Sequence, residues 1–221
     1  MNTLTEQTRL WQLISPALPA GGFHYSQGLE TAVQQGWVHD TSSTSDWIFG
    51  LLGHTLAAVD LPILVRILEA WRCRDSALVR WWDQQCHAYR ETRELREEEQ
   101  NRGRALLRLI TDLGDPVPDA PFGLGFVAAF AVAAAPYALS SREVAAGYAW
   151  SWCEGQVGVA IKLVPLGQTD GQRILRQLGS ALPETVDAAL LCLDEDIGRS
   201  TPCLAISSAN HETQYSKLFR S

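Results

Sequence analysis

A histidine and a glutamate near the end of the chain offer the first candidate for chemistry. The stretch HETQY, from His211 to Tyr215, differs by one residue from HExxH. In HExxH two histidines one helical turn apart bind zinc, and the glutamate acts as a general base. Tyr215 stands at the second ligand position, so the stretch lacks a zinc ligand. Four more histidines are scattered singly along the chain: His24, His39, His54 and His87. Such isolated histidines indicate packing or surface positions.

Glycine-rich turns are the second candidate, because their backbone N–H groups can bind phosphate. PAGGFHYSQG, residues 19–28, has neither the GxxxxGK[ST] pattern nor a β-strand before it. VPLGQTDGQ, residues 164–172, has no lysine at the required place and better fits a turn that enters a helix. No GxSxG nucleophile motif occurs. The sequence predicts a binding or scaffolding protein with no cofactor, and an enzyme site assembled from scattered residues stays the alternative.

The composition is that of a folded, acidic protein. Of 221 residues, 46% are hydrophobic, and the formal net charge is −7 with a pI near 5.2. One domain is expected, and nucleic acid is not an expected partner because no basic surface is available. The five cysteines have no CxxC spacing, so we expect reduced thiols that pack as small core residues. The N-terminal stretch is unlike a secretory signal, and a cytoplasmic protein is expected.

The least polar segment, residues 120–141, carries no charge and invites comparison with a membrane span. Pro136 cannot continue a helix, so the helical part is expected from Phe122 to Ala135. That length corresponds to roughly 21 Å, against a hydrocarbon core of about 30 Å. The sequence therefore predicts a buried central helix and no membrane contact.

Apolar residues recur at helical spacing through the rest of the chain, and no long stretch alternates with the period of a strand. A proline-rich linker is predicted at residues 112–121. We expect an all-α, single-domain bundle of roughly eight to ten helices. Besides the alanine-rich segment, the predicted helices are 47–59 with N-caps within 41–45, one beginning near Leu61-Pro62, 78–89, 142–164, one near 170–178, and 183–193.

The run RETRELREEEQNRGR, residues 90–104, is almost entirely charged. Arg90 and Glu94, and likewise Arg93 and Glu97, are four residues apart and would pair on one helix face. We interpret the run as a solvated helix surface. A docking face for a charged partner is the alternative, and spacing does not separate the two.

Several of these stretches together resemble the UreF family of urease accessory proteins. The resemblance is carried by LWQLISPALPAGGFHYSQGLE, DLPILVRI, the charged run, the alanine-rich helix, AWSWCEGQVGVAIKLVPLGQTDGQRIL and HETQYSKLFRS, in the family's order and over essentially the full length. Two positions depart from the family's usual pattern. His24 stands where a small residue is common, and Gly155 replaces an asparagine. No role is therefore assigned to either position.

The resemblance implies an all-helical, dimer-forming chaperone of urease maturation that is not itself an enzyme. Such a protein would join UreH (also called UreD) and the nickel-carrying GTPase UreG in a complex that acts on apo-urease. It would assist lysine carbamylation and nickel delivery, and a role in regulating GTP hydrolysis is proposed for the family. A helical interaction scaffold unrelated to urease is the alternative.

The expected contact residues come from three places in the chain. Phe23 and Tyr25 lie in a rigid Pro/Gly turn within residues 15–30 and could be contact hot spots or core plugs. Lys162 matches a family lysine implicated in partner function, and the alternative is a lysine at a helix end. Gln168 and Gln172 could cap the next helix or hydrogen-bond to UreG.

The polar C-terminal segment, residues 207–221, is the third place. Tyr215, Leu218 and Phe219 have i, i+3, i+4 spacing, so a helix here would present one apolar stripe to a groove. Lys217 and Arg220 would flank the stripe. The resemblance favours UreH as the groove, with ordering of the segment on binding. Docking of the segment on the protein's own core is the alternative.

Overall fold

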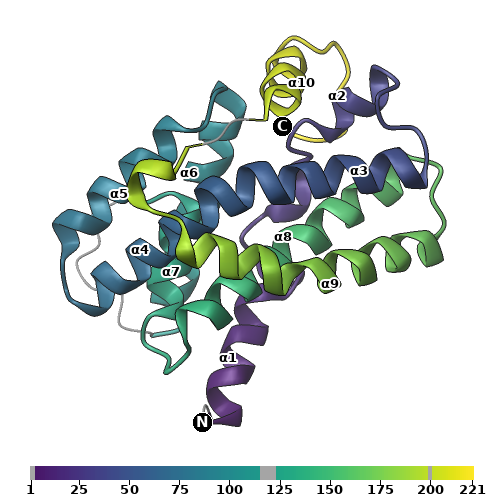
Figure 1. The fold of residues 1–221 in the computed structure, drawn as a ribbon. Coiled ribbons are helices and arrows are strands. Elements are labelled where there is room, and N and C mark those ends of the chain that lie inside the picture. Colours follow the sequence, from purple (N-terminus) through teal and green to yellow (C-terminus); the bar gives the residue numbers. More distant parts are fainter. Residues whose placement is uncertain (1–2, 115–122, 199–200) are drawn as a thin grey trace.

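A computed structural model describes residues 3–114, 123–198 and 201–221. Across these ranges the chain is helical and contains no β-strand, which confirms the all-α prediction. Figure 1 shows α1 projecting from one end of the bundle and α10 lying at the opposite end beside α2. The α-helices are α1 (Leu4–Ile14), α2 (Leu29–Gln34), α3 (Thr41–Leu51), α4 (Leu61–Arg72), α5 (Ser76–Ala88), α6 (Arg93–Asp112), α7 (Phe126–Ala134), α8 (Ser141–Leu163), α9 (Gln168–Leu191) and α10 (Pro202–Glu212).

The longest helical stretch crosses the middle of the bundle (Figure 1). α3 continues into a π-helical segment, Leu52–Asp60, and then directly into α4. The helix predicted to begin near Leu61-Pro62 does not begin there, because residues 41–72 form one continuous helix. Pro62 has no N–H to donate, and the wider π-helical turns before it accommodate the missing bond. Residues 41–72 are long and apolar enough to cross a membrane, yet 61% of the apolar window is buried, as in a core helix.

α7 occupies the centre of the core, as predicted for the alanine-rich segment. All nine of its residues are buried. α6 passes so close to the start of α7 that a Cβ on Gly103 would lie 2.2 Å from the carbonyl oxygen of Leu124. Small residues therefore allow α6 and α7 to approach closely. Phe122, the predicted first residue of this helix, lies outside the described residues.

α8 and α9 pack side by side, and both lie against the continuous helix that contains α3 and α4 (Figure 1). The prediction of two helices separated before Pro183 is wrong, because α9 continues through this proline. The buried residues of α9 recur across the proline at helical spacing, and we attribute the continuity to the packing of this stripe, which outweighs one lost hydrogen bond. The stripe consists of Ile174, Leu175, Leu178, Leu182, Val186 and Ala189.

α1 is a helix that the sequence reasoning missed. Thr3 caps it, and the Glu6 carboxylate accepts the Thr3 N–H at 2.6 Å, which completes a capping box. The spacing Thr3-x-x-Glu6 is visible in the sequence and could have identified the helix. Leu10 and Ile14 pack against Gly147 of α8, so the C-terminal half of α1 is anchored to the bundle.

The predicted linker and cysteine environments have mixed outcomes. Asp112 is the last residue of α6, and residues 115–121 lie outside the described residues. All five cysteines are free thiols. Cys86 and Cys153 are buried as expected, whereas Cys73 and Cys203 are exposed. The expectation of small core residues is therefore wrong for these two exposed cysteines.

The charged run at the start of α6 is not the solvated face predicted. Glu94, Glu98 and Glu99 are all buried. The predicted pair Arg93–Glu97 does face solvent, at 3.9 Å. The run does form a helix, but one side of it is buried. That side can be acidic because cations and N–H groups from other elements bind its carboxylates.

Arg90 is the cation that faces Glu99, and it pairs with different residues from those predicted. It lies in the connection before α6 and donates to Asp60 at 2.8 Å and to Glu99 at 2.9 Å. Glu99 also accepts the N–H of Val127 at 2.8 Å, which ties α6 to α7. Burial raises the pKa of Asp60, and the positive charge of Arg90 opposes this rise. We call Asp60, Arg90 and Glu99 the core ion cluster.

Candidate partner-binding surface

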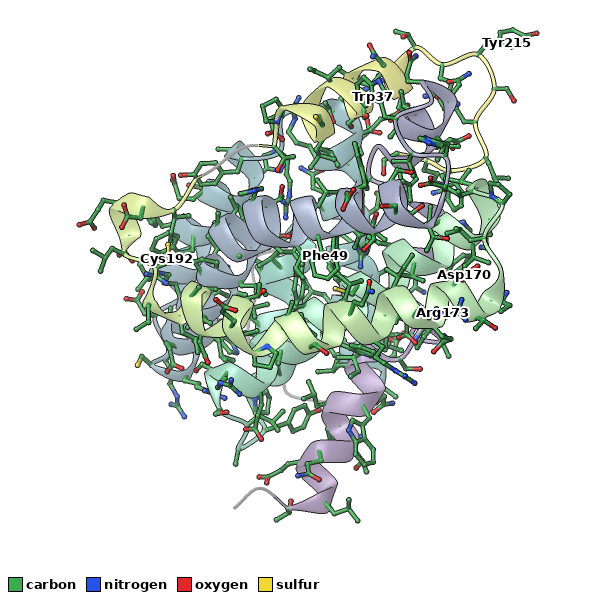
Figure 2. All side chains as sticks on the ribbon, turned by 45° about the vertical axis from the view of Figure 1, so that its right-hand side comes forward. Trp37, Phe49, Asp170, Arg173, Cys192 and Tyr215 are labelled. Atoms are coloured by element: carbon green, nitrogen blue, oxygen red, sulfur yellow. The ribbon has the colours of Figure 1, made fainter. Side chains whose placement is uncertain are left out.

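Of the predicted C-terminal segment 207–221, residues 207–212 lie in α10, which ends at Glu212, and the residues after it form a turn and bends instead of the predicted helix. We now call residues 214–221 the C-terminal segment. Phe219 is 6% exposed, whereas Leu218 is 67% exposed and Tyr215 is fully exposed. Figure 2 shows Tyr215 pointing away from the molecule. The three side chains therefore do not form one apolar stripe, because the non-helical backbone places Phe219 inward and the other two outward.

Phe219 anchors the segment on the protein's own apolar surface. It packs in a small cluster formed by α2, the chain after it and the C-terminal end of α8, and this is the alternative that the sequence left open. The other buried members of the cluster are Leu29, Ala32, Val38, Val159, Ala160 and Val164. The ammonium of Lys162 lies 5.8 Å from the centre of the Phe219 ring. A predicted contact residue on α8 is thus adjacent to one in the segment.

Backbone hydrogen bonds join this segment to the N-terminal turn. The N–H of Arg220 donates to the carbonyl oxygen of His24 at 2.8 Å, and the N–H of Ser26 donates to that of Ser221 at 2.7 Å. The Ser221 hydroxyl also donates to Glu98 at 3.1 Å. Residues from both ends of the described chain therefore build one surface, although Arg220 itself is exposed.

Glu30 binds the backbone of the segment. Its carboxylate accepts the N–H of Leu218 at 2.7 Å and the N–H of Phe219 at 2.8 Å. The amide of Gln214 also donates to it, at 3.4 Å. One buried carboxylate on α2 thus satisfies consecutive N–H groups that have no helical partner within the segment.

His211, the last histidine, lies fully buried beneath this segment. Its Nδ1 is 2.6 Å from a Glu94 oxygen and its Nε2 is 3.4 Å from a Glu30 oxygen. Lys217 donates to the other oxygen of Glu94 at 2.7 Å. We call Glu30, Glu94, His211 and Lys217 the tail clasp. The sequence reasoning examined His211 as a zinc ligand, and its actual neighbours come from helices far away in the chain.

The Pro/Gly turn in the N-terminal segment holds its two aromatic residues differently. Tyr25 is buried, whereas Phe23 is 57% exposed. Gly28 has φ of 79°, a conformation that favours glycine, and a Cβ there would lie 2.9 Å from the Ser207 Cβ. Gly28 thus permits α10 to pack directly on the start of α2.

A cavity of about 210 Å³ opens between this turn and α8. Phe23, Tyr25 and Lys162 all line it, so three predicted contact residues share one hollow. Gly155 and Gly158 also line the cavity, and nothing lies within 4 Å of a Cβ placed on either. The absence of side chains at these two positions keeps this side of α8 open.

A polar floor connects the cavity with the C-terminal segment. Gln27 accepts the indole N–H of Trp152 at 2.7 Å and donates to Glu98 at 2.8 Å. Arg102 pairs with the same Glu98 oxygen at 2.8 Å. Because Glu98 also receives the Ser221 hydroxyl, the cavity floor and the segment share one buried carboxylate.

Gln168 and Gln172 lie on α9, exposed and outside the cavity lining. Gly167 is the N-cap of α9, so the predicted capping role of these glutamines is wrong. Figure 2 shows Asp170 and Arg173 on the same part of α9, where their side chains form an ion pair at 2.7 Å. Lys162 is in the last turn of α8 and is exposed, as expected of a lysine at a helix end.

The described residues offer no ready metal centre, because no group of three or more His, Cys, Asp or Glu side chains among them is arranged to hold an ion. The sequence reasoning missed Glu30, Glu94 and Glu98, which hold the C-terminal segment. The only sign of them in the sequence is that these acidic residues fall on the same helix sides as the apolar residues of α2 and α6.

Comparison with known proteins identifies the family. The UreF family model matches residues 38–179. The urease accessory protein UreF of Alkalilimnicola ehrlichii is 47% identical over 219 residues, which cover 97% of this chain and 96% of that protein. The chain belongs to the UreF family. The UreF of Chromohalobacter salexigens is 47% identical, covering 96% and 93% of the two chains. That of Pseudomonas putida is 45% identical over all of both chains.

UreF family membership confirms the resemblance seen in the sequence and supports a role in urease maturation. The relatives are named as accessory proteins rather than as enzymes.

Proposed function

We propose that this UreF-family protein is an adaptor in urease maturation. It links the nickel-carrying GTPase UreG to UreH (UreD) and apo-urease, assists nickel insertion and influences GTP hydrolysis, without catalysing a reaction itself. It works in the cytoplasm as a homodimer. The supporting observation is the shared surface that carries exposed Phe23, Tyr215 and Leu218 and in which the buried carboxylates of Glu30 and Glu98 bind Leu218 and Ser221 of the C-terminal segment.

The C-terminal segment is the proposed contact for UreH. Exposed aromatic and aliphatic side chains on a fixed backbone are typical of interface hot spots, because little conformational entropy is lost on binding. Tyr215 and Leu218 meet this description, since the neighbouring N–H groups of Leu218 and Phe219 are bound by Glu30. Phe219 supports the contact from beneath and does not take part directly.

Lys162, Gln168 and Gln172 are the proposed contacts for UreG. They lie at the junction of α8 and α9, where Lys162 ends one helix and Gln168 begins the next. All three side chains are exposed. Gln168 and Gln172 lie outside the cavity, whereas Lys162 lies 5.8 Å from the Phe219 ring, so the proposed UreG contact adjoins the proposed UreH contact on the C-terminal segment.

Co-purification with tagged UreH tests the first contact. Deletion of residues 214–221 should abolish capture while the circular dichroism spectrum stays helical. The double variant Tyr215→Ala/Leu218→Ala should weaken capture at least tenfold, about 1.4 kcal/mol. Leu191→Ala is the matched control, because Leu191 is 81% exposed at the far end of α9. Unchanged capture by the deletion variant would refute the UreH contact, and turnover of a small molecule by the pure chain would refute the adaptor role.

A further inference from the structure

We infer that His211 is held as a doubly protonated imidazolium that fastens residues 214–221 to α2 and α6, and that loss of one proton releases this segment. The segment's docking is then governed by pH. This inference concerns the isolated chain and does not depend on the proposed partners.

The positions of the two ring nitrogens carry the inference. Nδ1 faces the Glu94 carboxylate at 2.6 Å and Nε2 faces the Glu30 carboxylate at 3.4 Å. A carboxylate only accepts hydrogen bonds, and a neutral imidazole has one N–H donor and one lone pair. A neutral ring would therefore turn a lone pair toward one carboxylate. Only the imidazolium donates to both, and the side chain is fully buried, so water cannot replace the missing donor.

The charges around the ring balance only when it is protonated. Glu30 from α2 and Glu94 from α6 contribute two negative charges, and Lys217 from the segment contributes one positive charge. The neighbouring Glu212 is directed to the backbone instead, since its carboxylate accepts the N–H of Arg93 at 2.8 Å. A neutral His211 would leave the tail clasp with one uncompensated negative charge in a buried site, which is unfavourable.

Protonation of His211 is coupled to the segment through Glu30. The Glu30 oxygen that faces Nε2 is the same one that accepts the N–H of Phe219. Its other oxygen accepts the N–H of Leu218. If His211 is neutral and its Nε2 lone pair faces Glu30, the two groups repel each other and burial of the Glu30 carboxylate becomes unfavourable. Glu30 reaches water most readily if residues 214–221 leave. Lys217 would lose its position on Glu94 in the same movement.

The sign of the effect follows from which state binds the extra proton. The docked state holds His211 charged and the released state leaves it free to titrate, so docking is strongest at acidic pH and weakens as pH rises. For a single proton, the equilibrium between docked and released segment changes by up to about tenfold per pH unit, over the pH range in which the docked state holds one proton more than the released state.

Nitrogen NMR on wild-type protein with ¹⁵N-labelled histidine is the first test. The signals of His211 are assigned by their loss in His211→Gln. At pH 6, both ring nitrogens of His211 should show the shifts of protonated nitrogens. A neutral tautomer, with one unprotonated nitrogen, would overturn the inference. This measurement on the wild type does not require the variant to keep its segment docked.

Hydrogen exchange of residues 214–221, followed by mass spectrometry between pH 6 and 9.5, is the second test. Protection is expressed relative to unstructured peptide at each pH, which removes the intrinsic pH dependence. Wild-type protection should fall, approaching tenfold per pH unit. His211→Gln should show low protection at every pH. The control His54→Gln alters an exposed histidine on the π-helical segment and should behave as wild type. Constant wild-type protection up to pH 9.5 would overturn pH-governed release.

Discussion

The core ion cluster and the tail clasp each place two buried carboxylates around a central cation, and they differ in that cation. Arg90 joins Asp60 and Glu99 inside the helical core. His211 joins Glu30 and Glu94 beneath a peripheral segment. Arginine keeps its charge at any pH a protein meets, whereas histidine loses its charge near neutrality. The same arrangement therefore gives a permanent bond in the core and a reversible one at the surface.

The two clusters also differ in what their loss would expose. The core ion cluster connects the π-helical segment Leu52–Asp60 to α6 and α7. None of these elements can leave without unfolding the bundle. The tail clasp holds residues that follow the last helix, which can detach while the helices stay packed. Buried charge is thus linked to global stability in one place and to local docking in the other.

The largest expected effect comes from removing the central cation of the core. Arg90→Met leaves Asp60 and Glu99 buried without their partner and should lower the free energy of unfolding by about 3–5 kcal/mol. Urea unfolding followed by circular dichroism measures this. Arg93→Met, which removes an exposed cation, should cost less than about 0.5 kcal/mol. Equal losses in both variants would show that the core ion cluster adds no stability beyond a surface pair.

A smaller effect is expected from Asp83 on α5, which accepts the N–H of Gly125 at 2.8 Å next to the core ion cluster. Burial raises the pKa of Asp83 to about 6. The folded chain thus keeps this proton up to about pH 6, whereas an unfolded chain releases it near pH 4. Stability from this group is therefore present at acidic pH and is lost as pH rises from about 4 to 6.

Asp83→Asn should remove this dependence, because the amide oxygen can still accept the Gly125 N–H without a charge. We expect a gain on the order of 2 kcal/mol at pH 7.5 and little gain at pH 4. Thermal unfolding of both proteins at the two pH values measures the difference. A gain that is the same at both values would contradict a raised pKa as its source.

Phe219→Ala tests whether the segment detaches independently of the bundle. Phe219 is as buried as a core residue, and truncating a phenylalanine in a core costs about 3–5 kcal/mol. Because the segment can undock first, the global loss should be below about 2 kcal/mol, while protection of residues 214–221 disappears. Phe130→Ala in α7 is the core control and should show the full loss. Equal global losses would mean that the segment unfolds only with the core.

The smallest stability effect is expected for Lys162→Ala. Its contact with the Phe219 ring, at 5.8 Å, is exposed and contributes at most about 0.5–1 kcal/mol. Urease activation in cells should nevertheless fall, because Lys162 is a proposed contact for UreG. Arg176→Ala, another exposed cation on the neighbouring helix, is the control. Wild-type activation by Lys162→Ala would remove this residue from the proposed interface.

Periodicity in the sequence was sufficient to predict most of the helices. The all-α class, α8 and the buried α7 follow from apolar spacing, and α1 could have been found from its capping box. The break predicted at Pro183 failed because a proline's local preference is outweighed by a continuous buried stripe on α9. The local preference of a residue predicts where a helix could end, but it does not include the packing energy that can keep the helix continuous.

The candidate surface could be predicted only in part. Phe23, Tyr25 and Lys162 were expected contacts, and they line one cavity. The carboxylates that organise the surface were not predicted, because their partners are distant in the chain. His211 and Glu94 are separated by 117 residues, and His211 and Glu30 by 181. The spacing of residues in the sequence cannot predict pairs that are so far apart in the chain. Acidic residues on a helix are also ordinarily exposed to solvent.

The bonds between the N-terminal turn and the C-terminal segment have a consequence for biosynthesis. The hydroxyl of Ser26 also donates to the carbonyl oxygen of Ser221, across 195 residues of chain. A ribosome makes the turn early and residues 214–221 only after α10 has been translated. A growing chain, or a product that stops before residue 214, would expose an apolar hollow on α2 and α8 in place of the finished surface. Completion of that surface would thus report that translation has passed the last helix.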